Sequence, residues 1–189
     1  AVMTHRAPTT FPILDVLAER WSPRAFDQNA TLTMADLSPA FEAARWAPSA
    51  NNLQPWSFVV GFRGDETFEK IAATLSGFNA AWAPHASALI VTVTHTLTAS
   101  GRLNAFARYD LGQAVAHFSV QAQANGISLH QMGGFDIDAL TTALGVNEPL
   151  EIVTVIAAGT PVDPATLSEE IAERENAPRE RKDVSEFVR

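Results

Sequence analysis

The stretch Ala88-Leu89-Ile90-Val91-Thr92-Val93-Thr94 decides the fold class. It is a continuous apolar and β-branched run, a pattern typical of a strand that is buried on both faces. We therefore expect it at the centre of a sheet. Two further strands are predicted, at residues 57–62 and 151–158.

Segments with helical periodicity separate these strands. Helices are predicted at 12–19, from 33 to near 48, at 65–75, from 110 to 125 and at 136–144. Thr33 and Asp36 have the spacing of a capping box, Asp110 and Asp136 are placed to cap their helices, and Gly145 is placed to end the last one. Loops or turns are predicted at 49–55, 77–84 and 131–134, with an irregular tail from 161 onward. Because helices and strands do not alternate strictly, an α+β fold is favoured over a doubly wound fold.

Length, charge and cysteine content limit the classes of function that are open to this protein. The 189 residues are predicted to form a single domain, 1–189, since no linker or repeat interrupts them. A net charge of −8 argues against a nucleic-acid partner, and the absence of cysteine excludes disulfides and thiolate chemistry. No apolar run approaches the roughly 20 residues of a membrane span. We expect a cytoplasmic protein with no membrane partner and, because the histidines stand singly, no metal site.

The first candidate motif is Arg20-x-Ser22-x-Arg24, directly after the first predicted helix. Side chains alternate along an extended segment, so these three would point to one side and could converge on one anion. Arginine suits a phosphate because its planar guanidinium donates two parallel hydrogen bonds and stays charged. Taken alone, the motif fits a solvated turn with a surface salt bridge better.

The second motif is Pro48-Ser49-Ala50-Asn51-Asn52-Leu53-Gln54-Pro55-Trp56. Its amides and hydroxyl supply both donors and acceptors, which suits the edge of a heterocycle with alternating N–H and C=O groups, such as a flavin. An Asx-type turn, in which the amides bond only the local backbone, explains the same residues.

The third motif is Met132-Gly133-Gly134, before the helix predicted near Asp136. Two glycines let the backbone approach a flat ligand and leave an N–H pointing at it, while Met132 can lie against an aromatic face. A plain tight turn is the simpler interpretation.

A late basic cluster, Arg179, Arg181 and Lys182, is the fourth motif. A solvated tail is the ordinary explanation for such charges. The interpretation changes if Arg20 and Arg24 lie nearby, since like charges gather stably only around an anion.

Taken in order, the four motifs resemble the nitroreductase family, and the resemblance covers nearly the whole chain. It implies an α+β fold in which a central mixed, mostly antiparallel sheet is wrapped by helices. It also implies an intertwined homodimer with two FMN molecules at its interface. Arg20, Ser22 and Arg24 would contact the phosphate and pyrimidine side of FMN, and Arg179 and Arg181 would close over the phosphate.

The same resemblance implies contacts to the flavin ring. Asn52 and Gln54 would bond the ring from the same chain's loop or its neighbour's, and Pro48 and Ser49 would reach it from the partner chain. The Gly133-Gly134 turn would present a backbone N–H toward N5 and O4. This chain has alanine at position 50, where many members carry a second serine, so one polar contact is lost or moved.

The activity implied is ping-pong hydride transfer from NAD(P)H through FMN to a small acceptor such as a nitroaromatic or quinone. No side chain is an obvious proton donor, so no catalytic residue is assigned. One alternative is a specialised relative that reduces an enal or semialdehyde, dehalogenates an aromatic or fragments flavin. Another is a non-enzymatic protein that binds or stores flavin.

Overall fold

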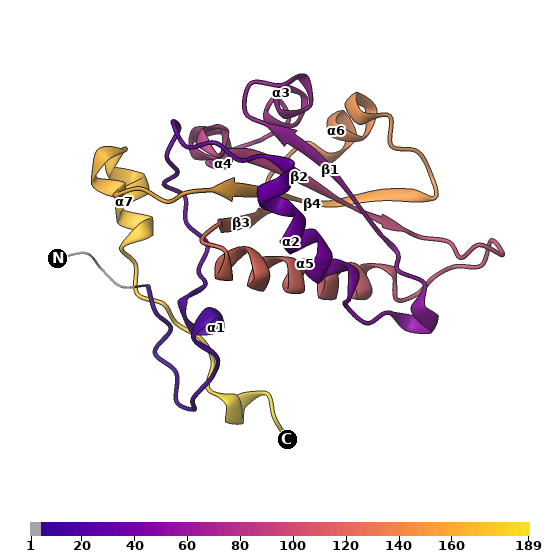
Figure 1. Cartoon of the computed structure of the whole chain (residues 1–189), viewed down its shortest axis with the longest axis horizontal. Coiled ribbons are helices and arrows are strands. Elements are labelled where there is room, and N and C mark those ends of the chain that lie inside the picture. Colours follow the sequence, from indigo (N-terminus) through magenta and orange to yellow (C-terminus); the bar gives the residue numbers. More distant parts are fainter. Residues whose placement is uncertain (1–4) are drawn as a thin grey trace.

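The structure, a computed structural model, describes residues 5–189 and is built on one four-stranded sheet (Figure 1). The strands are β1 (Trp56–Phe62), β2 (Ala88–His95), β3 (Ser128–Met132) and β4 (Leu150–Gly159), in the order β1-β2-β4-β3. The predicted α+β class and the two-sided burial of β2 are confirmed. All three pairings are antiparallel, whereas a mixed sheet would also contain a parallel pair.

Helices cover both faces of the sheet (Figure 1). They are α1 (Asp15–Glu19), α2 (Met34–Arg45), α3 (Glu66–Ala72), α4 (Asn79–Trp82), α5 (Ala107–Ala124), α6 (Ile137–Leu144) and α7 (Glu169–Glu175). Alternate residues of β2 serve two cores: Leu89 and Val91 join the cluster of α3 and α6, while Ala88 and Ile90 join that of α2 and α5. This alternation explains why β2 is apolar on both faces.

Several predicted helix ends are confirmed. The Thr33 hydroxyl accepts from the Asp36 N–H at 3.3 Å, and the Asp36 carboxylate accepts from the Thr33 N–H at 2.8 Å, which completes the capping box of α2. Asp136 caps α6, and Gly145 follows it with a left-handed φ of 64°. A φ of this sign favours glycine because it lacks a Cβ.

The prediction that Asp110 caps the long helix is wrong. Helix α5 begins at Ala107, and Asp110 lies buried within its first turn, where its carboxylate accepts a hydrogen bond from the Ala50 N–H. The first helix also begins later than predicted, at Asp15. The tertiary partner of Asp110 therefore overrides its local capping preference.

Three elements were not predicted. Strand β3 includes Met132, which we had assigned to a turn; α4 lies in the predicted loop, and α7 in the predicted irregular tail. Each is short, and β3 is an edge strand whose existence depends on its pairing with β4. Ser168 caps α7 with its hydroxyl.

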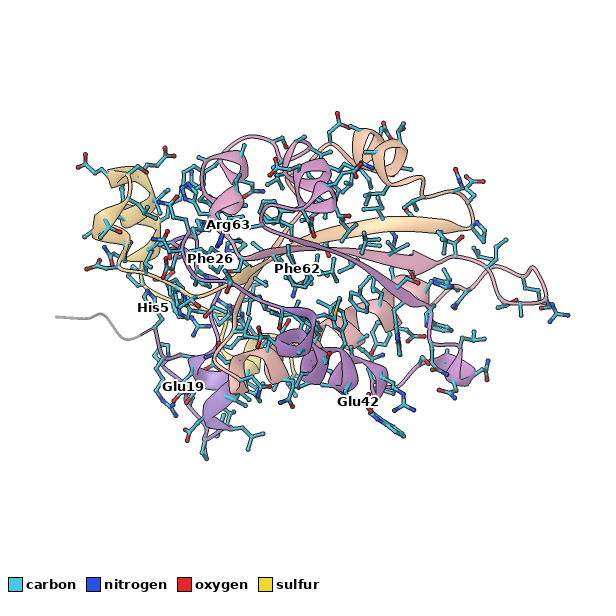
Figure 2. The ribbon with its side chains drawn as sticks, turned by 45° about the horizontal axis from the view of Figure 1, so that its top comes forward. His5, Glu19, Phe26, Glu42, Phe62 and Arg63 are labelled. Atoms are coloured by element: carbon cyan, nitrogen blue, oxygen red, sulfur yellow. The ribbon has the colours of Figure 1, made fainter. Side chains whose placement is uncertain are left out.

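The two ends of the chain meet at one end of the sheet. Phe26 forms an isolated bridge with Pro161, just after β4. Arg63 donates from Nη1 to the Ala30 carbonyl oxygen at 2.8 Å and so fixes the segment that follows Phe26. The side chains of Arg63 and Phe26 both lie at this end of the sheet (Figure 2). The N-terminal arm, by which we mean residues 5–14, meets the end of α7 through His5 and Glu175, which are 170 positions apart in sequence. Arg24 and Glu175, 151 positions apart, are also neighbours there.

Candidate functional site

A cavity of about 380 Å³ lies between the segment after α1 and the segment after α7. The predicted residues that line it are Arg20, Ser22, Arg24, Arg179 and Arg181. We call this cavity the arginine pocket. It brings together, within one chain, all five residues that the sequence assigned to the phosphate.

Burial and neighbouring positive charges lower the pKa values of two arginines in the arginine pocket. Burial lowers the pKa of Arg20, and the nearby Arg181 guanidinium lowers it further. Burial also lowers the pKa of Arg179, followed by the charges of Arg20 and Arg181. Guanidiniums that destabilise one another's charged forms gain most from a bound anion. In a chain of net charge −8, the arginine pocket is therefore a local concentration of positive charge.

One carboxylate, which the sequence analysis missed, lies at the wall of the arginine pocket. The side chain of Glu175 is 1% exposed, and its Oε1 lies 3.5 Å from Nη1 of Arg24. Its Oε2 is buried without a hydrogen-bond partner among the described residues. Glu175 offsets part of the charge of Arg24 from behind, and nothing in the local sequence distinguishes it from the acidic neighbours on α7.

The two tail arginines differ in their partners. Nη1 of Arg179 donates to the His5 carbonyl oxygen at 2.7 Å and to that of Ala18 at 3.2 Å, so this guanidinium ties the N-terminal arm to α1. Among the described residues, Arg181 donates only to the carbonyl oxygen of the adjacent Glu180. Arg181 therefore keeps more donors for a ligand.

His5 and Trp21 add an aromatic wall to the arginine pocket. Their rings stack with centroids 3.5 Å apart and planes 5° apart. His5 Nε2 lies 2.8 Å from the Glu175 carbonyl oxygen, and since a carbonyl only accepts, Nε2 carries the proton. The stack fixes the arm beside Arg20, which the sequence motifs did not indicate.

The Gly133-Gly134 turn follows the edge strand that borders the Ser22 segment. His130, three residues before Gly133, donates from Nδ1 to the carbonyl oxygens of Ser22 and Pro23, each at 3.0 Å. Burial lowers the pKa of His130, and the charge of Arg24 lowers it further. His130 therefore ties the edge strand that leads into the turn to the segment that lines the arginine pocket.

The two glycines of the turn have different surroundings. A Cβ at Gly133 would meet nothing within 4 Å, whereas a Cβ at Gly134 would lie 2.6 Å from Nδ2 of Asn79. The backbone of Gly133 is therefore open where a side chain would begin, and that of Gly134 is not. Met132 is buried in the core, so the prediction that it lies against a ligand ring is wrong.

The segment 49–55, which we call the polar loop, includes a short 3₁₀ helix, Ala50–Asn52. The Ser49 hydroxyl accepts from the Gln54 N–H at 3.1 Å, and Gln54 Nε2 donates to the Asn52 carbonyl oxygen at 3.0 Å. Pro48 and Ser49 line a cavity of about 220 Å³. Asn52 and Gln54 line another of about 300 Å³. Part of the Gln54 amide thus satisfies the local backbone, as the turn interpretation expected.

The polar loop and the arginine pocket lie at opposite ends of the sheet. The Pro55 carbonyl oxygen accepts from the hydroxyl of Thr94 on β2. At the other end, the Asp27 N–H, close to Arg24, donates to the carbonyl oxygen of Thr160 just beyond β4, whose Ala158 pairs with Ala88. Thr94 and Ala88 are six residues apart on β2, which at about 3.3 Å per residue is about 20 Å. One chain therefore does not bring all the predicted site residues together.

Two features are absent from the described residues, 5–189. None of the helices there combines the length and apolar character that crossing a bilayer requires. The same residues contain no cluster of three or more histidine, aspartate or glutamate side chains that could hold a metal ion.

Comparisons with known proteins identify the class. Residues 17–160 match the Nitroreductase family. The chain is 28% identical over 187 residues to YodC of Bacillus subtilis, which carries the provisional name NAD(P)H nitroreductase; the match covers 82% of this chain and 92% of YodC. It is 35% identical over 132 residues to an uncharacterized 15.4 kDa protein of Mycolicibacterium smegmatis, covering 66% of this chain and 88% of that protein.

Solved structures agree with these relatives. A crystal structure described as an oxidoreductase containing FMN superposes with a TM-score of 0.91 at 29% identity, covering 100% of this chain and 96% of that one. A nitroreductase-like structure from Exiguobacterium sibiricum, in complex with FMN, has the same fold, with a TM-score of 0.77 at 19% identity over 97% of this chain and 99% of that one. The chain belongs to the nitroreductase family, and the family predicted from the four motifs is confirmed.

Proposed function

We propose that the protein is an FMN-dependent oxidoreductase that takes hydride from NAD(P)H and passes it to a small acceptor, such as a nitroaromatic or quinone, in a ping-pong cycle. The observation that carries the proposal is the arginine pocket. In this acidic member of the nitroreductase family, it brings arginines from residues 20–24 together with arginines from residues 179–181. The oxidoreductase class and the use of FMN with NAD(P)H are also supported by the names of the relatives. FMN, when bound, supplies the hydride chemistry.

The residues of the arginine pocket fit a phosphate monoester. Arg20, Arg24 and Arg181 supply fork-shaped donors that match phosphate oxygens, and Ser22 adds a hydroxyl. Burial and the neighbouring arginines lower the pKa values of Arg20 and Arg179, and a dianionic phosphate would offset this local positive charge. Arg179 contributes charge but is held in place by backbone carbonyls, so we assign the closing contact to Arg181.

The ring end of the cofactor would lie against the Gly133-Gly134 turn. Gly133 leaves open space for it, and a backbone N–H there would be directed at N5 and O4. Donors held toward the ring favour added negative charge and so raise the reduction potential. We assign no side chain as proton donor and no catalytic residue.

The remaining contacts would come from a second copy of the chain. Pro48, Ser49, Asn52 and Gln54 lie at the other end of the sheet from the arginine pocket of the same chain. A homodimer in which the polar loop of each protomer reaches the flavin of its partner would complete both sites.

An absorbance spectrum of the purified protein with added FMN, followed by anaerobic addition of NADH or NADPH, tests the function. We expect a flavin spectrum that is perturbed on binding and bleached by one of the two nucleotides, with reoxidation by a quinone or nitroaromatic. A protein that does not bind FMN would contradict the proposal. Bound flavin that neither nucleotide bleaches would instead indicate a storage protein.

A further inference from the structure

The polar loop has an unusual backbone. Asn51, Asn52 and Gln54 have φ values of 51°, 55° and 51°, all in the left-handed region although none is glycine. Asparagine tolerates this region better than most residues, but glutamine has no such advantage. Three such residues within four positions persist only where surrounding contacts fix the loop.

Most hydrogen bonds of the polar loop join its own residues and cannot place it relative to the rest of the fold. These include the bonds from the Gln54 N–H to the Ser49 hydroxyl and from the Asn52 N–H to the Ser49 carbonyl oxygen. The far end of the loop is anchored to β2, because the Pro55 carbonyl oxygen accepts from the Thr94 hydroxyl at 2.9 Å. The near end needs a separate anchor.

Asp110 supplies that anchor from α5. Its Oδ2 accepts the Ala50 N–H at 3.0 Å, and its Oδ1 is 3.4 Å from the donor Nε2 of Gln113. The residue is only 2% exposed. A buried carboxylate is costly unless it accepts hydrogen bonds and meets positive charge; here the start of α5 supplies a partial positive charge in addition to the two donors.

We propose that Asp110 is a positioning residue, which holds the polar loop in its left-handed conformation and thereby directs Asn52 toward the flavin. It does not touch the cofactor or the reacting atoms and acts through the Ala50 N–H. This inference rests on the proposed function, because that function supplies the flavin that the polar loop would contact.

The test compares Asp110→Ala with Asp110→Asn, and uses Ser119→Ala as the matched control. Asparagine keeps an oxygen that can accept the Ala50 N–H, and alanine does not. Ser119 is buried on the same helix, and its hydroxyl bonds only to the Val115 carbonyl oxygen of that helix. Its loss therefore lowers stability without touching the loop.

Hydrogen exchange of the protein without FMN measures the protection of the Ala50 amide, and therefore the anchoring of the polar loop. We expect Asp110→Ala to lose protection at the Ala50 amide, Asp110→Asn to restore most of it and Ser119→Ala to leave it unchanged. FMN titration should show about a tenfold weaker affinity and an altered bound spectrum for Asp110→Ala, with affinity largely rescued in Asp110→Asn. Unchanged Ala50 protection in Asp110→Ala, or equal losses in all three variants, would overturn the proposal.

The two readouts also separate this proposal from the function on which it rests. If the wild-type protein binds no FMN while Asp110→Ala still loses Ala50 protection, the function fails and the anchoring of the loop stands. If the wild type binds FMN and Asp110→Ala binds it with the same affinity and spectrum, the positioning role fails and the function stands.

Discussion

The arginine pocket and the polar loop are built in opposite ways. The pocket draws its charges from segments about 150 residues apart, and the packing of α1, α7 and the N-terminal arm gathers them. The polar loop is a continuous stretch whose shape comes from its own hydrogen bonds and from Asp110. The first can be recognised only once the fold is known, whereas the second is legible in the sequence. Because they lie at opposite ends of the sheet, the proposed function makes each of them half of a site that a homodimer would complete.

Loss of Arg24 should produce the largest effect. We expect Arg24→Ala to weaken FMN binding about 100-fold, because a charge-assisted contact to phosphate is lost. It should also lower the free energy of unfolding by up to about 3 kcal/mol, because Glu175 is left buried without its partner. FMN titration measures the loss of affinity, and urea unfolding measures the loss of stability.

The double variant Arg24→Ala/Glu175→Gln separates these two losses. Neutralising the buried carboxylate should restore much of the stability and none of the FMN affinity. If the double variant recovers FMN affinity together with stability, Arg24 acts through folding alone and does not bind the phosphate.

The next comparison sets Arg181 against Arg179. Arg181→Ala should weaken FMN binding about 30-fold with little change in melting temperature, since within residues 5–189 this guanidinium bonds only the adjacent carbonyl oxygen. Arg179→Ala should lower the melting temperature as well, because it releases the arm from α1. Melting curves without FMN check this difference, and the reverse pattern would exchange the two roles.

A smaller effect is expected at the glycine turn. Gly133→Ala should leave the protein without FMN as stable as the wild type, since its new methyl group meets nothing. It should weaken FMN binding about tenfold if the ring occupies that space. Wild-type affinity in Gly133→Ala would move the ring away from the turn, and the matched Gly134→Ala should instead lose stability by displacing Asn79.

The smallest effect concerns pH. The pKa of His130 is lowered in the folded protein by burial and by Arg24, so the unfolded chain binds the proton more readily. The stability that the neutral imidazole contributes is present above the unfolded pKa of about 6.5 and is lost as pH falls toward the lower folded pKa. Urea unfolding at several pH values should show this decline below about pH 6.5. It should be reduced in Arg24→Ala, and an unchanged decline in His130→Gln would assign it to other groups.

Local patterns explain what the sequence could predict of the fold. The Thr33 capping box, the Asp136 cap and the two-sided apolar run of β2 depend on residues close in the chain, and all three were predicted correctly. Strand β3 was missed because its pairing with β4 is a long-range interaction, and α7 because its seven residues carry too little apolar pattern.

The residues of the candidate site also differ in whether they could be predicted from local sequence patterns. The motif residues at 20–24 and 179–181 were named from the sequence, but their convergence was conditional on a fold that only the structure supplies. Glu175 and Asp110 give no local signal of their roles, because each acts on a residue at least 60 positions away. Long-range partners of buried carboxylates are therefore the part of this site that sequence motifs leave out.

Mixing two defective variants tests the shared site most directly. Arg24→Ala damages the arginine pocket and Asn52→Ala the polar loop, and each homodimer should retain little FMN when the cofactor is limiting. If each flavin is held by the pocket of one protomer and the loop of the other, random heterodimers regain one intact site each. Co-refolding equal amounts should then restore about one quarter of the wild-type FMN binding. No recovery in verified heterodimers would contradict the account and place both sets of contacts within one chain.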